Sequence, residues 1–231
     1  MRRWSVRCWP TRRPSCRSIF VSAGEPLRAN DERLLAVFAG LGPGEWAAPS
    51  LCAEWSNHQV LAHMVVGYSC GVGEFGAALL RYRGFDPANT ALAVRLAAAR
   101  TPDQLLDDLA RLIAEPSGLG RMFPRTLLLG DHVTHELDIL YALGRQPDIP
   151  TDAVVAVLNT QVTVPNPFVP AYRNSRGLRL VAGDADWTHG SGPTVSGLAA
   201  ELVSVLGNRP RMLGALTGDG AAELAARVRM G

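Results

Sequence analysis

Lysine is absent from this sequence, and all 23 basic residues are arginine. Because arginine and the abundant alanine and glycine have GC-rich codons, this bias indicates a high-GC bacterial source such as an actinobacterium. Cysteine is scarce, and Cys8, Cys16, Cys52 and Cys70 show no CxxC spacing. The spacing argues against a disulfide scaffold or a thiolate zinc site, so a cytoplasmic protein in a reducing cytosol is expected.

Long apolar runs are also absent. No stretch approaches the ~20 apolar residues needed to cross a bilayer, so we expect no membrane insertion. The formal charge of +2 does not indicate nucleic-acid binding, because six arginines and no acid lie in the first 24 residues. The rest of the chain carries 17 arginines against 21 acids, a balance of −4. With 47% hydrophobic residues, the chain has ample material for a folded core.

Residues 1–24 show neither helical nor strand periodicity. Their only apolar stretch, residues 18–23, is shorter than the core of about 7 to 15 residues that a signal peptide needs. We therefore expect a disordered leader, and Val21 is an alternative start of the natural chain.

Amphipathic patterns predict four or five helices between residues 30 and 144. Their expected starts are Asn30 or Asp31, Ser56, Ala88, Thr101 and Pro124. Thr101-Pro102-Asp103-Gln104 has the form of a capping box, and Gly144 is suited to end the last helix. Short breaks between such helices imply an antiparallel bundle, in which inward side chains of facing helices can build a site.

The pattern changes after Gly144, where residues 146–150 resemble a linker. Helices are expected at 151–161, 194–206 and 220–229, and strands at 177–182 and 186–189. The predicted fold class is therefore α+β. A helical bundle at 25–147 is followed by a small α+β domain at 148–231, and we expect the two to have separate cores.

One face of the helix after Pro124 carries Asp131, His135 and Asp138, which follow one another at i, i+4 and i+7. Charged groups among apolar neighbours must be paired, metal-bound or solvated in a cavity. From this helix alone, the favoured interpretation is that Asp138 caps a helix or pairs with an arginine and that His135 is a core histidine. His63, on an apolar stripe of an earlier helix, is by itself also more typical of a structural histidine.

The order of several short motifs resembles the mycothiol-dependent maleylpyruvate isomerase family, from about Asn30 to the C-terminus. The N-terminal half is similar to the DinB-type metal-binding four-helix bundle. The motifs are VLAH after a tryptophan-containing loop, acid-x3-His-x2-Asp in a helix that ends in ALGR, LRLVAGDADWTHGSGP, GNRP and LTGDGAAELAARV. No single motif is specific, but their order and spacing together are.

This resemblance implies a divalent metal, expected to be zinc, bound by His63, Asp131 and His135. Imidazole and carboxylate ligands suit zinc, and three protein ligands leave a position open. Asp138 would orient the His135 ring. The family usually has glutamate where this chain has the shorter Asp131, so His132 is an alternative ligand.

The resemblance also implies a mycothiol-dependent enzyme, an isomerase or a thiol S-transferase, that activates the thiol on the metal for attack on a small electrophile. Asp138 and Arg209 are the candidate catalytic residues, and Arg209 or Arg179 could bind a substrate carboxylate. We expect a monomer or homodimer whose partners are the substrate and the thiol, with no nucleic acid or membrane. The alternative is a non-catalytic protein in which the same bundle binds a metal or a small ligand.

Overall fold

The computed structural model describes residues 24–52, 55–166 and 169–229. Of the predicted leader, 1–24, all but Gly24 lies outside the described residues, so its disorder stays a prediction. Within the described ranges, no helix is both long and apolar enough to cross a lipid bilayer.

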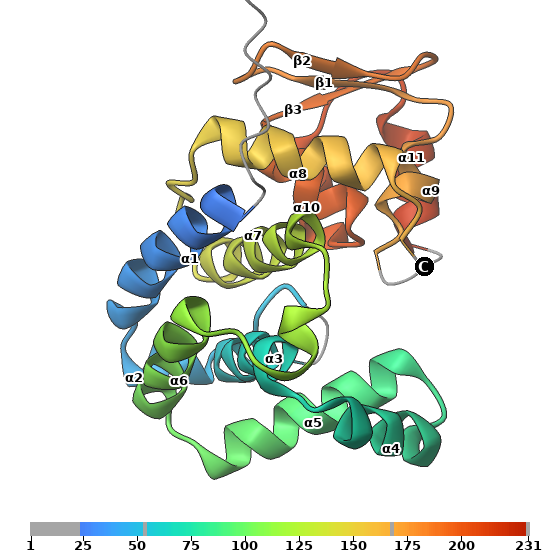
Figure 1. The fold of residues 1–231 in the computed structure, drawn as a ribbon. Helices are drawn as coiled ribbons and strands as arrows, with labels where there is room; N and C mark the ends of the chain where they lie inside the picture. The colour runs from blue at the N-terminus through green and yellow to red at the C-terminus, as the bar shows by residue number, and fades with distance from the viewer. Residues whose placement is uncertain (1–23, 53–54, 167–168, 230–231) are drawn as a thin grey trace, which may run out of the picture.

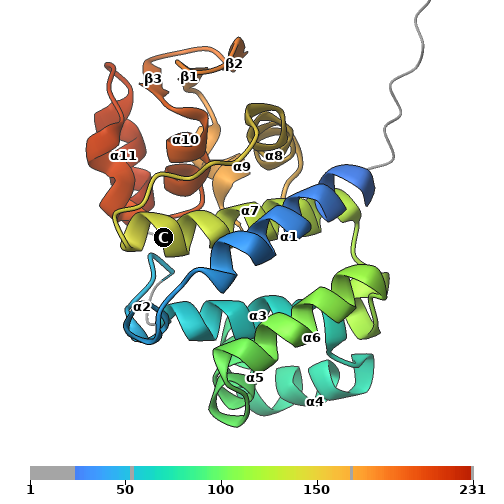
Figure 2. The ribbon, with the colours of Figure 1, turned by 90° about the vertical axis from the view of Figure 1, so that its left-hand side faces the viewer.

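The N-terminal part of the chain is a helical bundle (Figure 1). Its four main helices are α1 (Gly24–Ala39), α3 (Asn57–Ser69), α6 (Pro102–Ala114) and α7 (Arg125–Ala142). The bundle is extended by α4 (Val72–Tyr82) and α5 (Phe85–Ala99), and its connections hold the short helices α2 (Pro43–Ala47) and η1 (Gly118–Arg121). Helix α5 packs against both α3 and α4. Figure 2 shows α1 and α7 lying above α3 and α6.

Two helix starts follow directly from local sequence. Ser56 Oγ accepts a hydrogen bond from the Gln59 backbone NH at 3.2 Å, and the Gln59 side chain accepts one from the Ser56 NH at 2.8 Å. Thr101 and Gln104 form the same reciprocal pair at the start of α6, which confirms the predicted capping box. These pairs satisfy backbone NH groups that the first helical turn leaves without partners.

The predicted start of the first helix at Asn30 or Asp31 is wrong. Helix α1 begins at Gly24, and both residues lie within it with side chains almost fully buried, at 4% and 1% exposure. Asp31 accepts hydrogen bonds from Tyr68 on α3 and from His132 on α7. Partners that are distant in sequence, and not a helix terminus, therefore account for these polar residues.

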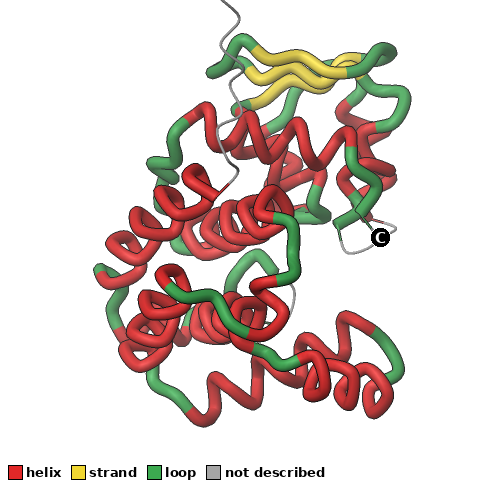
Figure 3. Tube along the Cα trace, in the orientation of Figure 1, coloured by secondary structure: helices red, strands yellow, loops and turns green. Residues whose placement is uncertain are grey.

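The C-terminal part combines a small sheet with helices on one side of it (Figures 1 and 3). Its elements are α8 (Thr151–Thr163), α9 (Ala171–Ser175), β1 (Arg179–Ala182), β2 (Trp187–His189), β3 (Thr194–Gly197), α10 (Ala199–Leu206), η2 (Pro210–Ala215) and α11 (Ala221–Arg229). The strand order is β2-β1-β3, with β1 antiparallel to β2 and parallel to β3. The α+β class, with a helical bundle followed by a small C-terminal α+β part, is confirmed.

The prediction of one helix from Thr194 to Leu206 is wrong, because its first four residues are β3. This strand pairs with β1, so that Leu180 lies opposite Val195. On its other side, the Ser196 NH and CO exchange hydrogen bonds with Thr217, each 2.8 Å long. The strand exists because both edges of this segment find backbone partners far along the chain, which local periodicity does not reveal.

A single cluster of buried apolar side chains runs through both parts of the chain. It includes Phe38 and Leu137 from the bundle as well as Leu158 and Val203 from the C-terminal part. Helix α7 packs directly against α8 and α10. The two parts are therefore docked against each other through apolar side chains, and both the expected separate cores and the domain bounds, 25–147 and 148–231, stay predictions. A smaller cluster fills the space between α3, α4 and α5.

Candidate metal centre

Helix α7 presents Asp131 and His135 one turn apart, and α3 brings His63 opposite them. The His63 Nε2 atom lies 3.4 Å from Asp131 Oδ2, and His135 Nε2 lies 3.5 Å from Asp131 Oδ1. The two imidazole rings are 4.6 Å apart between centroids. One donor atom from each of the three residues lies within 4.8 Å of the other two. The structure thus brings together the three side chains that the sequence selected as metal ligands.

The Nδ1 atom of each imidazole has a hydrogen-bond partner of its own. His63 Nδ1 lies 3.0 Å from Asn89 Oδ1 on α5, and His135 Nδ1 lies 3.0 Å from Asp138 Oδ2. An oxygen at this position accepts the Nδ1–H, which leaves Nε2 to face Asp131. Both rings are therefore oriented with Nε2 toward the same point, as metal-binding histidines usually are. Sequence reasoning missed Asn89, since nothing distinguishes it from any other polar residue of an alanine-rich helix.

Asp138 is fixed in turn by Arg209. The arginine Nε donates to Asp138 Oδ1 at 2.8 Å and its Nη2 donates to Oδ2 at 2.6 Å, a two-point ion pair that is almost wholly buried. Arg209 Nη1 also donates to the backbone oxygen of Gly207. The predicted pairing of Asp138 with an arginine is therefore found together with its predicted contact to His135.

The charges in this cluster depend on one another. Burial opposes ionisation of Asp138, yet Arg209 and His135 lower the pKa of its carboxyl to about 2. Burial likewise disfavours a charged His135, yet Asp131 and Asp138 raise the pKa of this imidazole to about 10. The pKa of Asp131 lies well below its usual value, because the two nearby histidines outweigh the effect of its burial. The site therefore attracts positive charge to the space beside Asp131.

The donor set fits a tetrahedral divalent ion. Ligand bonds of about 2.0 to 2.1 Å place the donors of a tetrahedral site about 3.3 Å apart. The Asp131 Oδ1 atom lies 3.5 Å from the Nε2 atom of His63 and 3.5 Å from that of His135, which is close to this value. The shorter aspartate therefore reaches the same point as the imidazole nitrogens. The Asp131 side chain is also 36% exposed, which leaves one side of the donor set open.

His132 lies on a different face of α7 and is not available to replace Asp131. Its Nδ1 lies 2.7 Å from Asp31 Oδ1, and Tyr68 donates to the other oxygen of that carboxylate at 2.6 Å. All three side chains are about 1% exposed. This buried group joins α1, α3 and α7 and thereby fixes the rotation of α7 that presents Asp131 to the site. Arg179 is exposed on β1 and does not line the site.

A cavity of about 740 Å³ opens beside the three ligand candidates. Its walls come from α3, α5, α7, α8 and the turn that carries Arg209. Trp55 covers the two imidazoles, with ring centroids 5.1 Å from His63 and 6.1 Å from His135. Cys52 lies within 4.8 Å of donor atoms of His135 and Asp138, and burial raises the pKa of its thiol. Sequence reasoning assigned no role to either residue, because their loop contains no repeating pattern.

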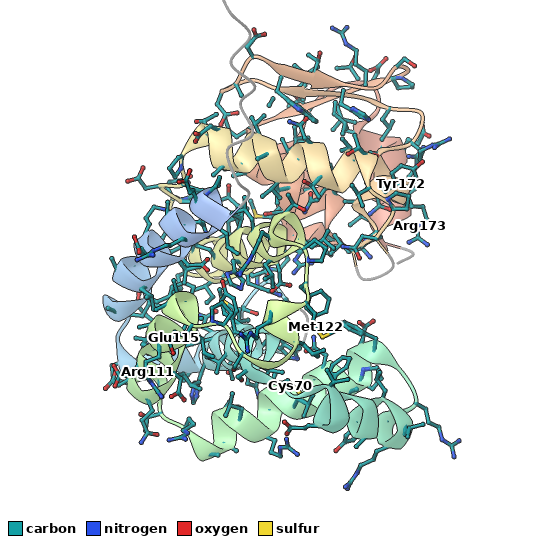
Figure 4. The ribbon with its side chains drawn as sticks, viewed as in Figure 1. Cys70, Arg111, Glu115, Met122, Tyr172 and Arg173 are labelled. Carbon is teal, nitrogen blue, oxygen red and sulfur yellow. The ribbon has the colours of Figure 1, made fainter. Side chains whose placement is uncertain are left out.

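Figure 4 labels side chains that lie outside this cavity. Among them, Met122 follows η1, and Tyr172 and Arg173 lie on α9. A separate hollow of about 590 Å³ lies between α3 and α6, where it is lined by Arg111 and Glu115. Neither of the described three-residue groups that could hold a metal lies in that hollow. Both of these groups contain residues that line the larger cavity.

Comparison with protein families places the N-terminal part. Residues 27–125 match the family model of the mycothiol maleylpyruvate isomerase N-terminal domain. The resemblance to the mycothiol-dependent maleylpyruvate isomerase family is confirmed. The match includes His63 and ends before Asp131 and His135, so it gives no information on these two candidate ligands. No curated protein sequence matches the chain.

Solved structures of mycothiol-dependent maleylpyruvate isomerase share the fold of nearly the whole chain. One crystal structure matches with a TM-score of 0.56 at 16% identity and covers 86% of this chain and 92% of its own. A histidine-to-alanine mutant of mycothiol-dependent maleylpyruvate isomerase matches with the same TM-score and coverage at 15% identity. At this identity the likeness concerns the fold, including the way in which the C-terminal part accompanies the bundle.

Proposed function

We propose that this protein is a metal- and thiol-dependent enzyme, an isomerase or thiol S-transferase that acts on a small electrophile. The metal is a divalent ion, zinc by the chemistry of the donors, bound by His63, Asp131 and His135. The thiol is a low-molecular-weight thiol, mycothiol by the family resemblance. The observation that carries this proposal is the convergence of two imidazole Nε2 atoms on one carboxylate at the wall of a cavity.

A divalent ion bound there supplies a positive field that favours the thiolate over the thiol and so makes a nucleophile at neutral pH. The residues around it supply orientation. Asp138 accepts the Nδ1–H of His135, and Asn89 does the same for His63, so both Nε2 lone pairs point to the ion. Trp55 covers the rings and excludes water from that side.

Asp138 and Arg209 act as positioning residues in this proposal. Both oxygens of Asp138 accept from Arg209, and one of them also contacts His135. The guanidinium of Arg209 is directed at Asp138 and at the Gly207 carbonyl. Its role is therefore to hold the carboxylate that holds the imidazole, in place of the sequence-based interpretation that it binds a substrate carboxylate.

The cellular setting of the proposal is a reducing cytosol. Cys52 and Cys70, the two cysteines within the described residues, are free thiols, as is usual for proteins of that compartment. The expected partners are the thiol and the electrophile, and the expected state is a monomer or homodimer.

The test combines metal analysis with thiol dependence. The purified full chain should contain about one zinc per molecule, and its thiol-dependent turnover should disappear on chelation and return with zinc. His63→Ala should lose the metal while its far-ultraviolet circular dichroism stays unchanged. His58→Ala, on the same helix but hydrogen-bonded to the Arg100 carbonyl outside the cavity, is the matched control and should keep the metal.

A protein that retains stoichiometric zinc but shows no thiol-dependent turnover and no thiol binding would be the non-catalytic alternative. A chain that binds no divalent ion would refute the assigned centre. Whether the thiol is regenerated or consumed then separates an isomerase from a transferase, because only a transferase keeps the thiol in its product.

A further inference from the structure

The large cavity has no free positive charge among its described lining residues. Its ionisable groups, apart from the metal-site histidines and Cys52, are Asp86, Asp131 and Arg209. Arg209 is neutralised by Asp138 at two points, with that carboxylate completely buried. Asp86 adds a negative charge on the wall formed by α5. A divalent ion with a bound thiolate would therefore leave no positive charge in surplus.

The rest of the lining is neutral. Hydroxyl and amide groups come from Thr90, Thr126, Gln161 and Asn208, whereas the Thr134 and Thr160 hydroxyls donate to backbone carbonyls of their own helices. Apolar surface is contributed by phenylalanine and aliphatic side chains of α3, α4, α5, α7, α8 and α11 and of the region after η1. The Gln161 Oε1 atom is buried and accepts no hydrogen bond from the described residues. Such a wall offers single hydrogen bonds and apolar contact, and its described residues offer no unpaired cationic side chain to a carboxylate.

We propose that the electrophile bound in this cavity is an uncharged molecule with an apolar body and polar neutral substituents, such as an ester or a ketone, and not a carboxylate. This inference rests on the proposed function, which supplies the thiolate. A carboxylate that enters a partly desolvated site without a counter-charge loses hydration worth several kcal/mol. A neutral carbonyl loses far less hydration free energy, and one hydrogen bond from an amide or hydroxyl donor replaces the hydrogen bond that it made to water.

Two unreactive ligands of the same shape test the inference. Dimethyl phthalate is uncharged and phthalate is a dianion, and both have an aromatic body. Titration calorimetry on the zinc-loaded full chain should give a Kd at least roughly tenfold lower for the diester. The comparison is severe, because phthalate could also bind the ion directly. A lower or equal Kd for phthalate overturns the inference, as does the absence of any diester binding up to about 10 mM.

A cation placed in the cavity should reverse the preference. Gln161→Arg puts a guanidinium where the unpaired amide oxygen lies, and phthalate should then bind at least roughly tenfold more tightly than to the original chain. Ala156→Arg, on α8 but outside the cavity lining, is the matched control and should leave both affinities unchanged. If Gln161→Arg strongly lowers the unfolding temperature, Thr90→Arg places the cation on the α5 side of the cavity instead, and phthalate binding is measured with that variant. Unchanged phthalate binding in a folded cavity variant contradicts the inference.

The two proposals fail in different ways. If the chain retains no zinc and uses no thiol, the proposed function fails. The Kd values of dimethyl phthalate and phthalate for the protein as purified then still test whether the cavity prefers an uncharged ligand. If zinc and thiol dependence are found but phthalate is the preferred ligand, the inference fails and the proposed function stands.

Discussion

Zinc affinity should rise with pH well beyond the range in which an ordinary histidine titrates. In the metal-free site, the proton on His135 lies between Asp131 and Asp138, and these carboxylates raise the pKa of the imidazole to about 10 despite its burial. A zinc ion needs the His135 Nε2 lone pair, so its binding must displace a proton at every pH below that value. The proton and the metal thus compete for the same position.

The size of the effect follows from the number of protons released. Release of one proton per zinc lowers the apparent Kd about tenfold for each unit of pH, and therefore about a hundredfold between pH 7.5 and 9.5. A ligand histidine with the ordinary pKa of 6.5 would be deprotonated over this whole interval, and its zinc affinity would be constant. The two cases differ by about two orders of magnitude.

The assay is a competition titration against a chelator of known affinity at several pH values, with calorimetry in two buffers of different ionisation enthalpy to count protons. Asp138→Asn provides the internal test. It removes one of the carboxylates that raise the pKa of His135, so the pH at which zinc affinity stops rising should move downward. An affinity that already levels off near pH 7.5 in the original chain, with no proton released at pH 8.5, would refute the reasoning.

Three further outcomes are expected. In the metal-free chain, the pKa of His135 is raised above its unfolded value of 6.5, so its contribution to stability is complete below pH 6.5 and is lost as the pH rises to about 10. Urea titrations between these pH values should show the free energy of unfolding falling by at most ~1.4 kcal/mol per pH unit, and a rise in this free energy would contradict the prediction. Arg209→Met leaves Asp138 buried without a counter-charge and should lower the free energy of unfolding by about 3 to 5 kcal/mol and the zinc affinity by about 10- to 100-fold. Unchanged zinc affinity would exclude the positioning role. His132→Phe leaves the Asp31 carboxylate without its imidazole partner and should destabilise the fold by a similar ~3 to 5 kcal/mol. Elemental analysis should show the same zinc content in the folded variant, and loss of zinc from it would place His132 among the ligands.

Local sequence was sufficient wherever the interaction partners are a few residues apart. The capping boxes at Ser56 and Thr101 needed only the residue three positions later, and both helix starts were found as predicted. The spacing of Asp131, His135 and Asp138 on one face of α7 follows from helix geometry alone. The α+β class was likewise evident, because the change of pattern after Gly144 lies within a few residues of the actual end of α7.

Sequence reasoning failed where partners lie far apart in the chain. β3 is a strand because β1 and Thr217 both pair with it, and no periodicity within residues 194–197 indicates this. Asp31 has the residue type of a helix cap, and only the fold reveals that Tyr68 and His132 are its partners. Burial of these groups depends on tertiary packing, which overrides local preference.

The candidate site divides in the same way. His63 was selected through the resemblance to a family, because its apolar stripe alone favoured a structural histidine. Its position opposite α7 depends on the packing of the bundle. Asn89, Trp55 and Cys52 could not be selected, since their contacts depend on where α5 and the loop before α3 lie. The spacing of the two candidate ligands on α7 is thus readable from one helix face, whereas the groups that orient and cover them are set by the packing of whole elements.

The C-terminal part is best understood as a component of the candidate metal centre. The orientation of His135 depends on Asp138, whose charge is stabilised by Arg209. Arg209 follows Asn208, which has a left-handed backbone with φ of 67°, and the buried Asn174 donates to the Asn208 side chain at 3.1 Å. A chain of contacts therefore runs from the C-terminal part to the imidazole. A protein ending before this turn would leave Asp138 buried without its cation, so the bundle alone cannot preserve the geometry of the site.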